Sequence, residues 1–234
     1  MKLLILLLLV LNVNAQPSLT VLGDSFPPFS YRANGKSHGM VYEMVESIIK
    51  DSKVEVKRNI ISSWKHVLEH TKANPNTLLY TIVRTPEREN QFEWIGAISD
   101  RRMYFYALKS RKDISIDSWK DIPKYQTLSL EKATITKYVR ERGAQIYPTT
   151  DLKQAYHMLL KGRADLVVML DYSLNHLDKK KLTKPLFKID QPGEFYIAMN
   201  KDSSPELVKK IRNSFNKLMK NGVIEKIKLK HSPK

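Results

Sequence analysis

The sequence predicts an α/β protein of two lobes, and three observations carry this prediction. Strand-like and helix-like apolar patterns alternate along the chain, which is typical of helices packed on largely parallel sheets. The charged stretch KSRKDISIDSWKDIPKY separates two such alternating sets. A second extended segment, residues 188–193, leads back to a last strand and a long helix. We therefore expect two lobes joined by two crossing segments, with a cleft where the carboxyl ends of the strands meet.

The elements before the charged stretch follow from their apolar spacing. Gly39–Ile49 has apolar residues at helical spacing, which predicts an amphipathic helix. Thr77–Val83 is almost wholly apolar, as expected for a strand with helices on both faces of its sheet. The same reasoning predicts strands at Ser18–Gly23, Val54–Asn59 and Met103–Leu108, and a helix at Trp64–Thr71.

The second set of elements has clear helix signals. Asp151 is a predicted N-cap for a helix that ends at Gly162, and Ser204-Pro205 opens the last long helix, which Gly222 ends. The remaining predictions are strands at Gln126–Leu130, Gln145–Pro148, Asp165–Leu170 and Glu194–Asn200, and a helix at Thr134–Arg142. We thus assign residues 16–108 to lobe one, 109–190 to lobe two and 191–234 to the return into lobe one. Hinges are expected near Leu108–Arg111 and Lys188–Gly193.

The first fifteen residues have the pattern of a signal peptide. Lys2 precedes an apolar run from Leu3 to Leu11, and Val13-Asn14-Ala15 supplies the small residues of a cleavage site. The alternative, a membrane anchor, needs a longer apolar run to span about 30 Å of hydrocarbon. We expect cleavage after Ala15 and export of the remaining chain.

Composition and motifs narrow the function. The formal net charge is +16, but no basic run is interleaved with aromatic residues, so nucleic-acid binding is not favoured. The chain has no cysteine and hence no disulfide. His66 and His70 form a helical pair without the third ligand that zinc needs. The sequence also has no nucleophile elbow and no Gly-rich phosphate loop. We expect no metal, no cofactor and no catalytic residues.

Segments along the whole chain after the leader resemble the periplasmic solute-binding proteins of family 3, which include the polar amino-acid receptors of ABC importers. The resemblance lies in the order of FPPFSY, NGKSHGMVYEMVESI, SSWKHVLEH, NTLLYTIVRTPEREN, YFYALKS, TDLKQAYHMLLKGRADLVV and EFYIAMNKDS. It implies the type II two-lobed fold of periplasmic binding proteins. It also implies a small polar ligand between the lobes and lobe one built from both chain ends.

The resemblance implies a carboxylate-binding arginine in the turn Thr85-Pro86-Glu87-Arg88, so Arg88 takes that role. A guanidinium binds a carboxylate through two parallel hydrogen bonds, which lysine does not do. Arg84 is expected to supply a second contact or to orient the loop. The alternative for both arginines is a surface ion pair with a neighbouring glutamate, Glu87, Glu89 or Glu93.

The second lobe offers two further candidates by the same resemblance. Thr134 is expected to bind an anion at a helix start, or else to cap that helix. The segment Glu131-Lys132-Ala133 stands where the family has Gly-Thr or Gly-Ser. Asp171 is expected to hold the ammonium group of an amino acid, or else to be an N-cap.

Aromatic residues complete the expected site. Tyr31 and Trp64 are assigned to the walls of the pocket, where they stack on a ligand. Phe29 is a further candidate, and for Phe26 and Phe29 the alternative is a place in the core.

The expected function is capture of a small carboxylate, an amino acid or similar solute, by a monomeric periplasmic protein that delivers it to an ABC permease. One alternative is a dehydratase-like enzyme of the same fold, in which Asp171 or Glu131 acts as general acid. Another is a sensory or partner-binding domain. Such sensory domains normally continue into a membrane helix and a signalling module, and this sequence has neither after Lys234.

Overall fold

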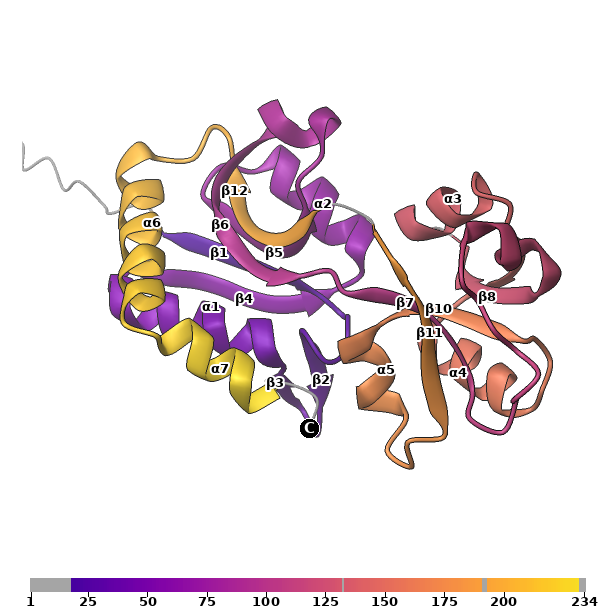
Figure 1. Cartoon of the computed structure of the whole chain (residues 1–234). Helices are drawn as coiled ribbons and strands as arrows, with labels where there is room; N and C mark the ends of the chain where they lie inside the picture. The colour runs from indigo at the N-terminus through magenta and orange to yellow at the C-terminus, as the bar shows by residue number, and fades with distance from the viewer. Residues whose placement is uncertain (1–17, 132, 191–192, 232–234) are drawn as a thin grey trace, which may run out of the picture.

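A computed structural model describes residues 18–131, 133–190 and 193–231, and it has two lobes, each built on a five-stranded sheet (Figure 1). The predicted signal peptide lies outside these residues. The α/β class and the two-lobed architecture are confirmed.

The sheet of the first lobe has the order β4-β1-β5-β12-β6. Its strands are β1 (Leu19–Asp24), β4 (Val56–Ser62), β5 (Thr77–Val83), β6 (Phe92–Asp100) and β12 (Glu194–Asn200). β1 pairs in parallel with β4 and β5, whereas β12 is antiparallel to both β5 and β6. The return strand β12 therefore lies between β5 and β6, two strands that come much earlier in the chain.

Helices cover both faces of this sheet. They are α1 (Met40–Ser52), α2 (Trp64–Ala73), α6 (Pro205–Lys220) and α7 (Val223–His231). The apolar stripe of α1 is buried with Leu78 and Tyr80 of β5 and with the stripe of α6. Leu79 and Ile82 of β5 are instead clustered with Val67 of α2. Neighbouring residues of β5 thus pack against helices on opposite faces of the sheet, as its almost wholly apolar sequence predicts.

The sheet of the second lobe has the order β11-β7-β10-β8-β9. Its strands are β7 (Met103–Leu108), β8 (Gln126–Leu130), β9 (Gln145–Thr149), β10 (Leu166–Leu170) and β11 (Thr183–Ile189). The helices of this lobe are α3 (Thr134–Arg140), α4 (Leu152–Leu160) and α5 (Asp171–Leu177), with a 3-10 helix η2 (Trp119–Lys124). Leu128, Leu159 and Val167 meet in a core cluster of this lobe.

The sheets are mostly parallel, as predicted, because only β12 in the first sheet and β7 in the second run opposite to the other described strands of their sheet. One expectation about the architecture is wrong. The first crossing is earlier than residue 108, because β7 pairs with β10 and β11 of the second lobe. The chain leaves the first sheet after Asp100 and enters the second at Met103, so the crossing is Arg101–Arg102.

The two crossings run side by side. Asp100 pairs with Glu194 at the end of the first sheet, and Met103 pairs with Ile189 at the start of the second. The end of β11 and the start of β12 thus lie on either side of Arg101–Arg102. Figure 1 shows α2 and α3 on one side of these crossings, and α5 with the hairpin β2 (Tyr31–Ala33) and β3 (Lys36–His38) on the other.

Candidate functional site

The candidate site is built at the carboxyl ends of three neighbouring parallel strands. β1 ends at Asp24, β4 ends just before Trp64, and β5 leads through Val83 to the 3-10 helix η1 (Pro86–Gln91) that carries Arg88. Loops at the carboxyl edge of parallel strands converge, and ligands of open α/β sheets bind there. The strand order β4-β1-β5 therefore gathers residues from three separate segments at one edge.

Arg88 and Trp64 are brought together at this edge. The Arg88 Cζ lies 5.6 Å from the centre of the Trp64 ring, and the Arg88 Nη1 donates a hydrogen bond of 3.1 Å to the Val83 carbonyl. Burial lowers the pKa of Arg88, and the charge of Glu87 opposes this shift. Among the described residues no carboxylate lies within ion-pair distance of Arg88. Its half-buried guanidinium is therefore held in place with donors left for a ligand.

Arg84 lies on a different surface. Its Nε donates to Glu89 Oε2 at 2.8 Å, its Nη2 contacts Glu89 Oε1, and its Cζ lies 5.3 Å from the centre of the Trp94 ring. This is the surface ion pair that the sequence analysis gave as the alternative. Arg84 and Arg88 therefore have different surroundings. Arg84, just after β5, contacts Glu89 and Trp94, whereas Arg88, in η1, contacts Trp64 and the Val83 carbonyl.

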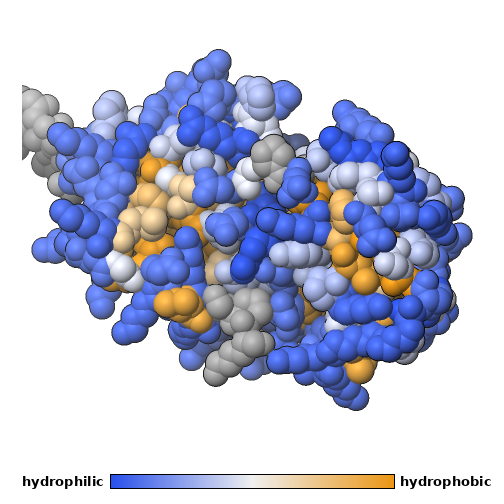
Figure 2. Space-filling model, in the orientation of Figure 1, coloured by the Kyte–Doolittle hydropathy of each residue, from blue (hydrophilic) through white to orange (hydrophobic). Residues whose placement is uncertain are grey.

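Arg101 lies on the first crossing and is only 8% exposed. Its Cζ is 5.6 Å from the centre of the Phe195 ring, and Phe195 pairs with Val83 in the sheet. Burial lowers the pKa of Arg101, and the charge of Arg88 lowers it further. The guanidinium groups of Arg88 and Arg101 thus interact at the junction of the lobes. Figure 2 shows that the surface between the two lobes is mainly hydrophilic.

Asp171 is held at the same junction by the other arginine of the crossing. Arg102 Nε lies 2.9 Å from Asp171 Oδ2, and the Asp171 N–H donates to the Arg102 carbonyl at 3.0 Å. Asp171 Oδ1 also accepts a hydrogen bond of 2.6 Å from the Tyr172 N–H. Burial raises the pKa of Asp171, and Arg102 opposes this shift. Asp171 is the first residue of α5, whose N-cap is Leu170, so Asp171 does not fill the N-cap position.

The two phenylalanines of the loop after β1 differ in exposure, because Phe29 lies in the core and Phe26 lies partly at the surface. Phe29 is fully buried, with ring centres of Phe26, Phe195 and Tyr172 at 5.2, 5.3 and 5.6 Å. Phe29 therefore supports the wall from behind and offers no surface to a ligand, which corrects its assignment as a contact residue. Phe26 is partly exposed in front of it.

Among the described residues, neither Tyr31 nor Thr134 makes a side-chain hydrogen bond or ring contact with Arg88. Tyr31 lies on the β2–β3 hairpin, with its ring centre 5.6 Å from that of His176 on α5 and 5.8 Å from that of His38. It therefore contacts the second lobe through its helix. Thr134 is exposed at the first position of α3, whose N-cap is Ala133, so the alternative role of Thr134 as the cap of this helix is not confirmed.

Strain marks the strand that leads to Arg88. Thr81 of β5 has φ of 63°, which a β-branched residue rarely adopts. It lies at the register shift between Tyr196 and Ile197 of β12, so β5 has a bulge two residues before Val83. Bulges of this kind re-aim the end of a strand and occur often beside functional sites.

Asp24 has a half-buried carboxyl group at the same edge, and this burial raises its pKa to about 6, opposed by a hydrogen bond from the Ser25 backbone. The folded state therefore favours the neutral form. Since the folded pKa lies above the unfolded value of about 3.9, the contribution of Asp24 to stability is fully present below pH 4 and is lost as the pH rises through 6.

We expect Asp24→Asn to raise the free energy of unfolding at pH 7 by about 2 kcal/mol. The variant should also lose the fall in stability between pH 4 and pH 6. Urea denaturation at a series of pH values measures both effects. Asp202→Asn, a change at an exposed position, is the matched control. Equal stability of Asp24→Asn and the parent at pH 7 would contradict the prediction.

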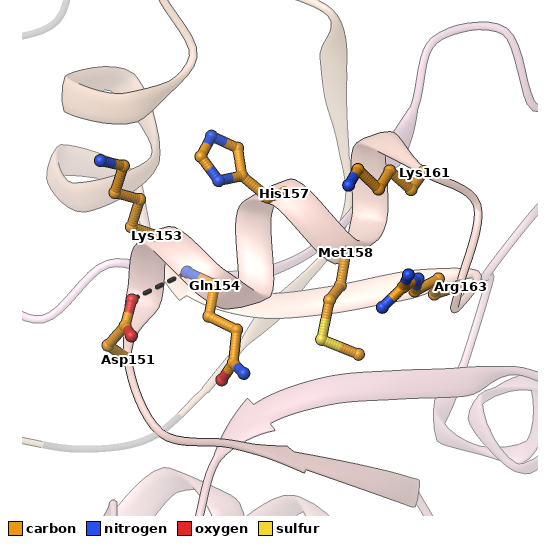
Figure 3. Close-up of a pocket in the computed structure, with 7 residues that line it drawn as sticks. All are labelled: Asp151, Lys153, Gln154, His157, Met158, Lys161 and Arg163. Atoms are coloured by element: carbon orange, nitrogen blue, oxygen red, sulfur yellow. Dashed lines mark hydrogen bonds between the residues drawn. The ribbon is translucent and has the colours of Figure 1, made fainter.

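A separate hollow lies beside α4 of the second lobe (Figure 3). It has a volume of about 380 Å³ and is lined mainly by residues of α4. Asp151 caps this helix by accepting a hydrogen bond of 2.8 Å from the Gln154 N–H. The lining includes none of the residues at the lobe junction described above, so this hollow is not the candidate site.

Comparison with known proteins decides the family. The family model for bacterial extracellular solute-binding proteins, family 3, matches residues 19–234. The chain belongs to this family. A search of curated proteins gave no match. Within the described residues, no helix has the length and apolarity required to cross a membrane, and no group of acidic residues, histidines or cysteines has the arrangement of a metal site.

Solved structures share the fold of this family 3 protein. An ancestral arginine-binding protein bound to arginine is 20% identical with a TM-score of 0.75, and the match covers 92% of this chain and 98% of the other. A histidine kinase sensor domain is 18% identical with a TM-score of 0.77, covering 91% and 95%. An ancestral amino-acid-binding protein, a precursor of cyclohexadienyl dehydratase, is 20% identical with a TM-score of 0.75, covering 91% and 94%.

The sequence analysis missed Arg101, Arg102, Phe195 and Asp24 as residues of the candidate site. The two arginines stand next to each other in SDRRMYFYAL, just before the strand pattern Met103–Leu108. Once Phe92–Asp100 is recognised as a strand, this arginine pair lies between two strands and marks the crossing. The signal for Asp24 was an acidic residue directly after an apolar strand.

Proposed function

We propose that this family 3 protein captures a small carboxylate solute between its lobes and delivers it to an ABC-type permease. The observation that carries the proposal is the half-buried guanidinium of Arg88, held by Trp64 and the Val83 carbonyl at the carboxyl edge of three strands. An amino acid or a similar carboxylate is also what the structural relatives bind, arginine in one case and amino acids in the other. The proposed setting is the periplasm, and the proposed state is a monomer.

The mechanism is binding without bond-making. A carboxylate at Arg88 forms charge-assisted, bidentate hydrogen bonds, which are stronger when water is excluded. The proposed hinge is the crossing Arg101–Arg102 together with the predicted return segment Lys188–Gly193, because the chain passes between the two sheets at these places. Movement at these segments closes the second lobe over the ligand, and the permease recognises the closed form.

We expect Arg88→Gln to weaken carboxylate binding roughly 10- to 100-fold, because a charged hydrogen-bonding partner is lost from a half-buried position. Isothermal titration of the purified protein with amino acids and small dicarboxylates measures the effect. Arg84→Gln is the matched control, since Arg84 is exposed and paired with Glu89, and it should bind as the parent does. Unchanged affinity in Arg88→Gln would remove Arg88 from the site.

The enzyme alternative needs Asp171 or Glu131 as a general acid. Glu131 is exposed, and both oxygens of the Asp171 carboxyl group are engaged, Oδ2 by Arg102 and Oδ1 by the Tyr172 N–H. Binding without chemistry therefore has the better support. Incubation with prephenate or arogenate distinguishes the two functions, because turnover of either compound would overturn the proposal of a pure binding protein.

A further inference from the structure

Helix α5 of the second lobe contacts the loop that follows β1 in the first lobe. The Ser173 Oγ donates a hydrogen bond of 3.2 Å to the Pro27 carbonyl, and the ring centres of Tyr172 and Phe29 are 5.6 Å apart. Phe29 also lies 5.3 Å from the ring centre of Phe195, which follows the return crossing on β12. These buried contacts are therefore close to the crossings, where a rotation of the lobes displaces atoms least.

Tyr31 and His176 make a second contact between the lobes. Their ring centres are 5.6 Å apart, and both side chains are partly exposed. His176 is five residues beyond Asp171, which Arg102 holds at the crossing, so it lies about 7.5 Å farther along the helix. A rotation about the crossings therefore moves these two rings apart more than it moves the buried contacts at Phe29.

The hairpin of β2 and β3 places Tyr31 at this contact. Asn34 and Gly35 close the hairpin with positive φ values of 51° and 75°, as an Asn-Gly turn between two strands requires. The register pairs Tyr31 with His38, and the two ring centres are 5.8 Å apart. The Tyr31 ring is thus held by a histidine of its own lobe while it contacts a histidine of the other lobe.

Among the described residues, no acidic group is positioned to pair with a protonated His176. The two segments that meet here, residues 24–43 and 171–180, contain four acidic residues: Asp24, Glu43, Asp171 and Asp178. Three of them are engaged elsewhere, Glu43 by Lys230, Asp171 by Arg102, and Asp178 by the Tyr156 hydroxyl of the neighbouring α4 and by three other donors. Asp24 favours its neutral form below pH 6.

The same segments carry four cationic side chains: Arg32, Lys36, Lys179 and Lys180. Burial and the charge of Lys179 both lower the pKa of His176, and no carboxylate opposes this shift. Because the pKa in the contact lies below the ordinary value of about 6.5, the contact favours the neutral ring. The contribution of His176 is therefore fully present above about pH 6.5 and is lost as the pH falls through the lowered pKa.

We propose that Tyr31 and His176 are positioning residues for lobe closure, which hold the lobes in the closed arrangement while His176 is neutral and release them when it is protonated. The inference rests on the proposed function. A contact that favours the closed arrangement strengthens the binding of any solute enclosed between the lobes, without touching the solute. The protein therefore releases its solute more readily at acidic pH.

The first test measures the arrangement of the lobes without a solute. The chain has no cysteine, so Lys50→Cys on α1 and Asn175→Cys on α5 place one spin label on each lobe at an exposed position. Pulsed EPR should give mainly one short distance at pH 8. At pH 5 the ratio of closed to open molecules should fall roughly 3- to 10-fold, the loss expected for one ring contact. Labels at Lys153→Cys and Asn175→Cys, both in the second lobe, should keep their distance.

The second test compares variants of the labelled chain, with circular dichroism to verify folding. His176→Phe keeps a ring that cannot be protonated and should remain closed at both pH values. Tyr31→Ala should be shifted towards the open arrangement at both, and Tyr31→Phe, which keeps the ring, should respond as the parent does. His38→Phe is the matched control and should retain the response to pH, because His38 contacts Tyr31 from its own lobe.

Asp24, with a pKa of about 6, titrates in the same range and remains in His176→Phe. A response to pH that persists in His176→Phe would therefore overturn the inference and indicate Asp24 instead. The inference also fails if the parent gives the same label distance at pH 8 and pH 5, if His38→Phe abolishes the response, or if a folded Tyr31→Ala is as closed as the parent.

The two proposals fail in distinguishable ways, because the label distances are measured without a solute. If these distances do not respond to pH but Arg88→Gln loses carboxylate binding, only the inference about Tyr31 and His176 fails. If the distances respond as expected but Arg88→Gln binds every carboxylate as the parent does, the proposed site fails and the contact between the lobes stands.

Discussion

Gly39→Ala is expected to lower the free energy of unfolding by roughly 2–5 kcal/mol. Gly39 precedes α1 and has φ of 125° and ψ of 161°, a region open essentially to glycine alone. A Cβ at this position would lie 2.3 Å from the Phe29 carbonyl oxygen and 2.8 Å from the Ser30 Cα. Both neighbours are backbone atoms, so no side-chain rotation relieves the clash.

The close approach exists because a loop caps this helix. The Met40 N–H donates to the Pro28 carbonyl at 3.0 Å, and the Val41 and Tyr42 N–H groups donate to the Phe29 carbonyl at 2.9 and 3.2 Å. Gly39 makes no side-chain cap, and the carbonyls of the preceding loop satisfy the first N–H groups instead. The same loop carries Phe26, so a shift of the loop also displaces the wall of the candidate site.

Thermal unfolding measures this effect, with an expected fall in Tm of about 5–15 °C. Gly35→Ala is the matched control. Gly35 also has a positive φ, 75°, but a Cβ there would meet no atom within 4 Å. We expect Gly35→Ala to cost only about 1 kcal/mol. Similar losses in the two variants would mean that the contact with Phe29 does not determine the need for glycine at position 39.

The fold was predictable where the apolar pattern is continuous. Thr77–Val83, Met103–Leu108, Gln126–Leu130 and Glu194–Asn200 were predicted with the bounds that the structure has. β6 was missed because Gly96 interrupts its pattern. A Cβ at Gly96 would lie 2.0 Å from Phe215 Cε1, so the absence of a side chain at this position allows α6 to pack closely on the sheet. β11 was missed because it is an edge strand with Lys184, Pro185 and Lys188, and edge strands tolerate proline and charge.

The candidate site was predictable only in part. Trp64 and Arg88 follow neighbouring parallel strands, so their convergence follows from the order of the elements. The different positions of Arg84 and Arg88 depend on side-chain direction within one turn, which spacing alone does not give. Arg101 depends on a crossing whose preceding strand was not recognised. The burial of Phe29 is a tertiary effect of Phe195 and Tyr172, residues more than a hundred positions away.

Asp178→Ala is expected to destabilise the protein by roughly 3–5 kcal/mol, because it leaves several buried donors unsatisfied. Asp178 Oδ1 accepts hydrogen bonds of 2.9 Å from both the Tyr156 hydroxyl and the Leu182 N–H. Asp178 Oδ2 accepts from the Thr183 N–H at 2.9 Å and from its hydroxyl at 2.5 Å. The carboxylate thereby joins α4, the end of α5 and the start of β11.

Urea denaturation measures the free energy of unfolding of Asp178→Ala and of Asp151→Ala. The comparison distinguishes a buried carboxylate that accepts four hydrogen bonds from an exposed helix cap. Asp151 accepts one side-chain hydrogen bond, from Gln154 N–H, at an exposed helix start. We expect its loss to cost only about 1 kcal/mol. A loss for Asp178→Ala no larger than that for Asp151→Ala would show that the four donors find other partners.

The pH dependence gives an independent measure of Asp178. Burial alone would raise its pKa, but hydrogen bonds from Thr183, Leu182 and Tyr156 outweigh burial and lower it. Because the folded pKa lies below the unfolded value of about 3.9, the contribution is fully present above that value and is lost as the pH falls through the folded pKa. The stability difference between the parent and Asp178→Asn should therefore be constant from pH 6 to 8 and shrink below about pH 4. A difference that stays constant down to pH 2 would mean that the hydrogen bonds do not depend on the ionised carboxylate.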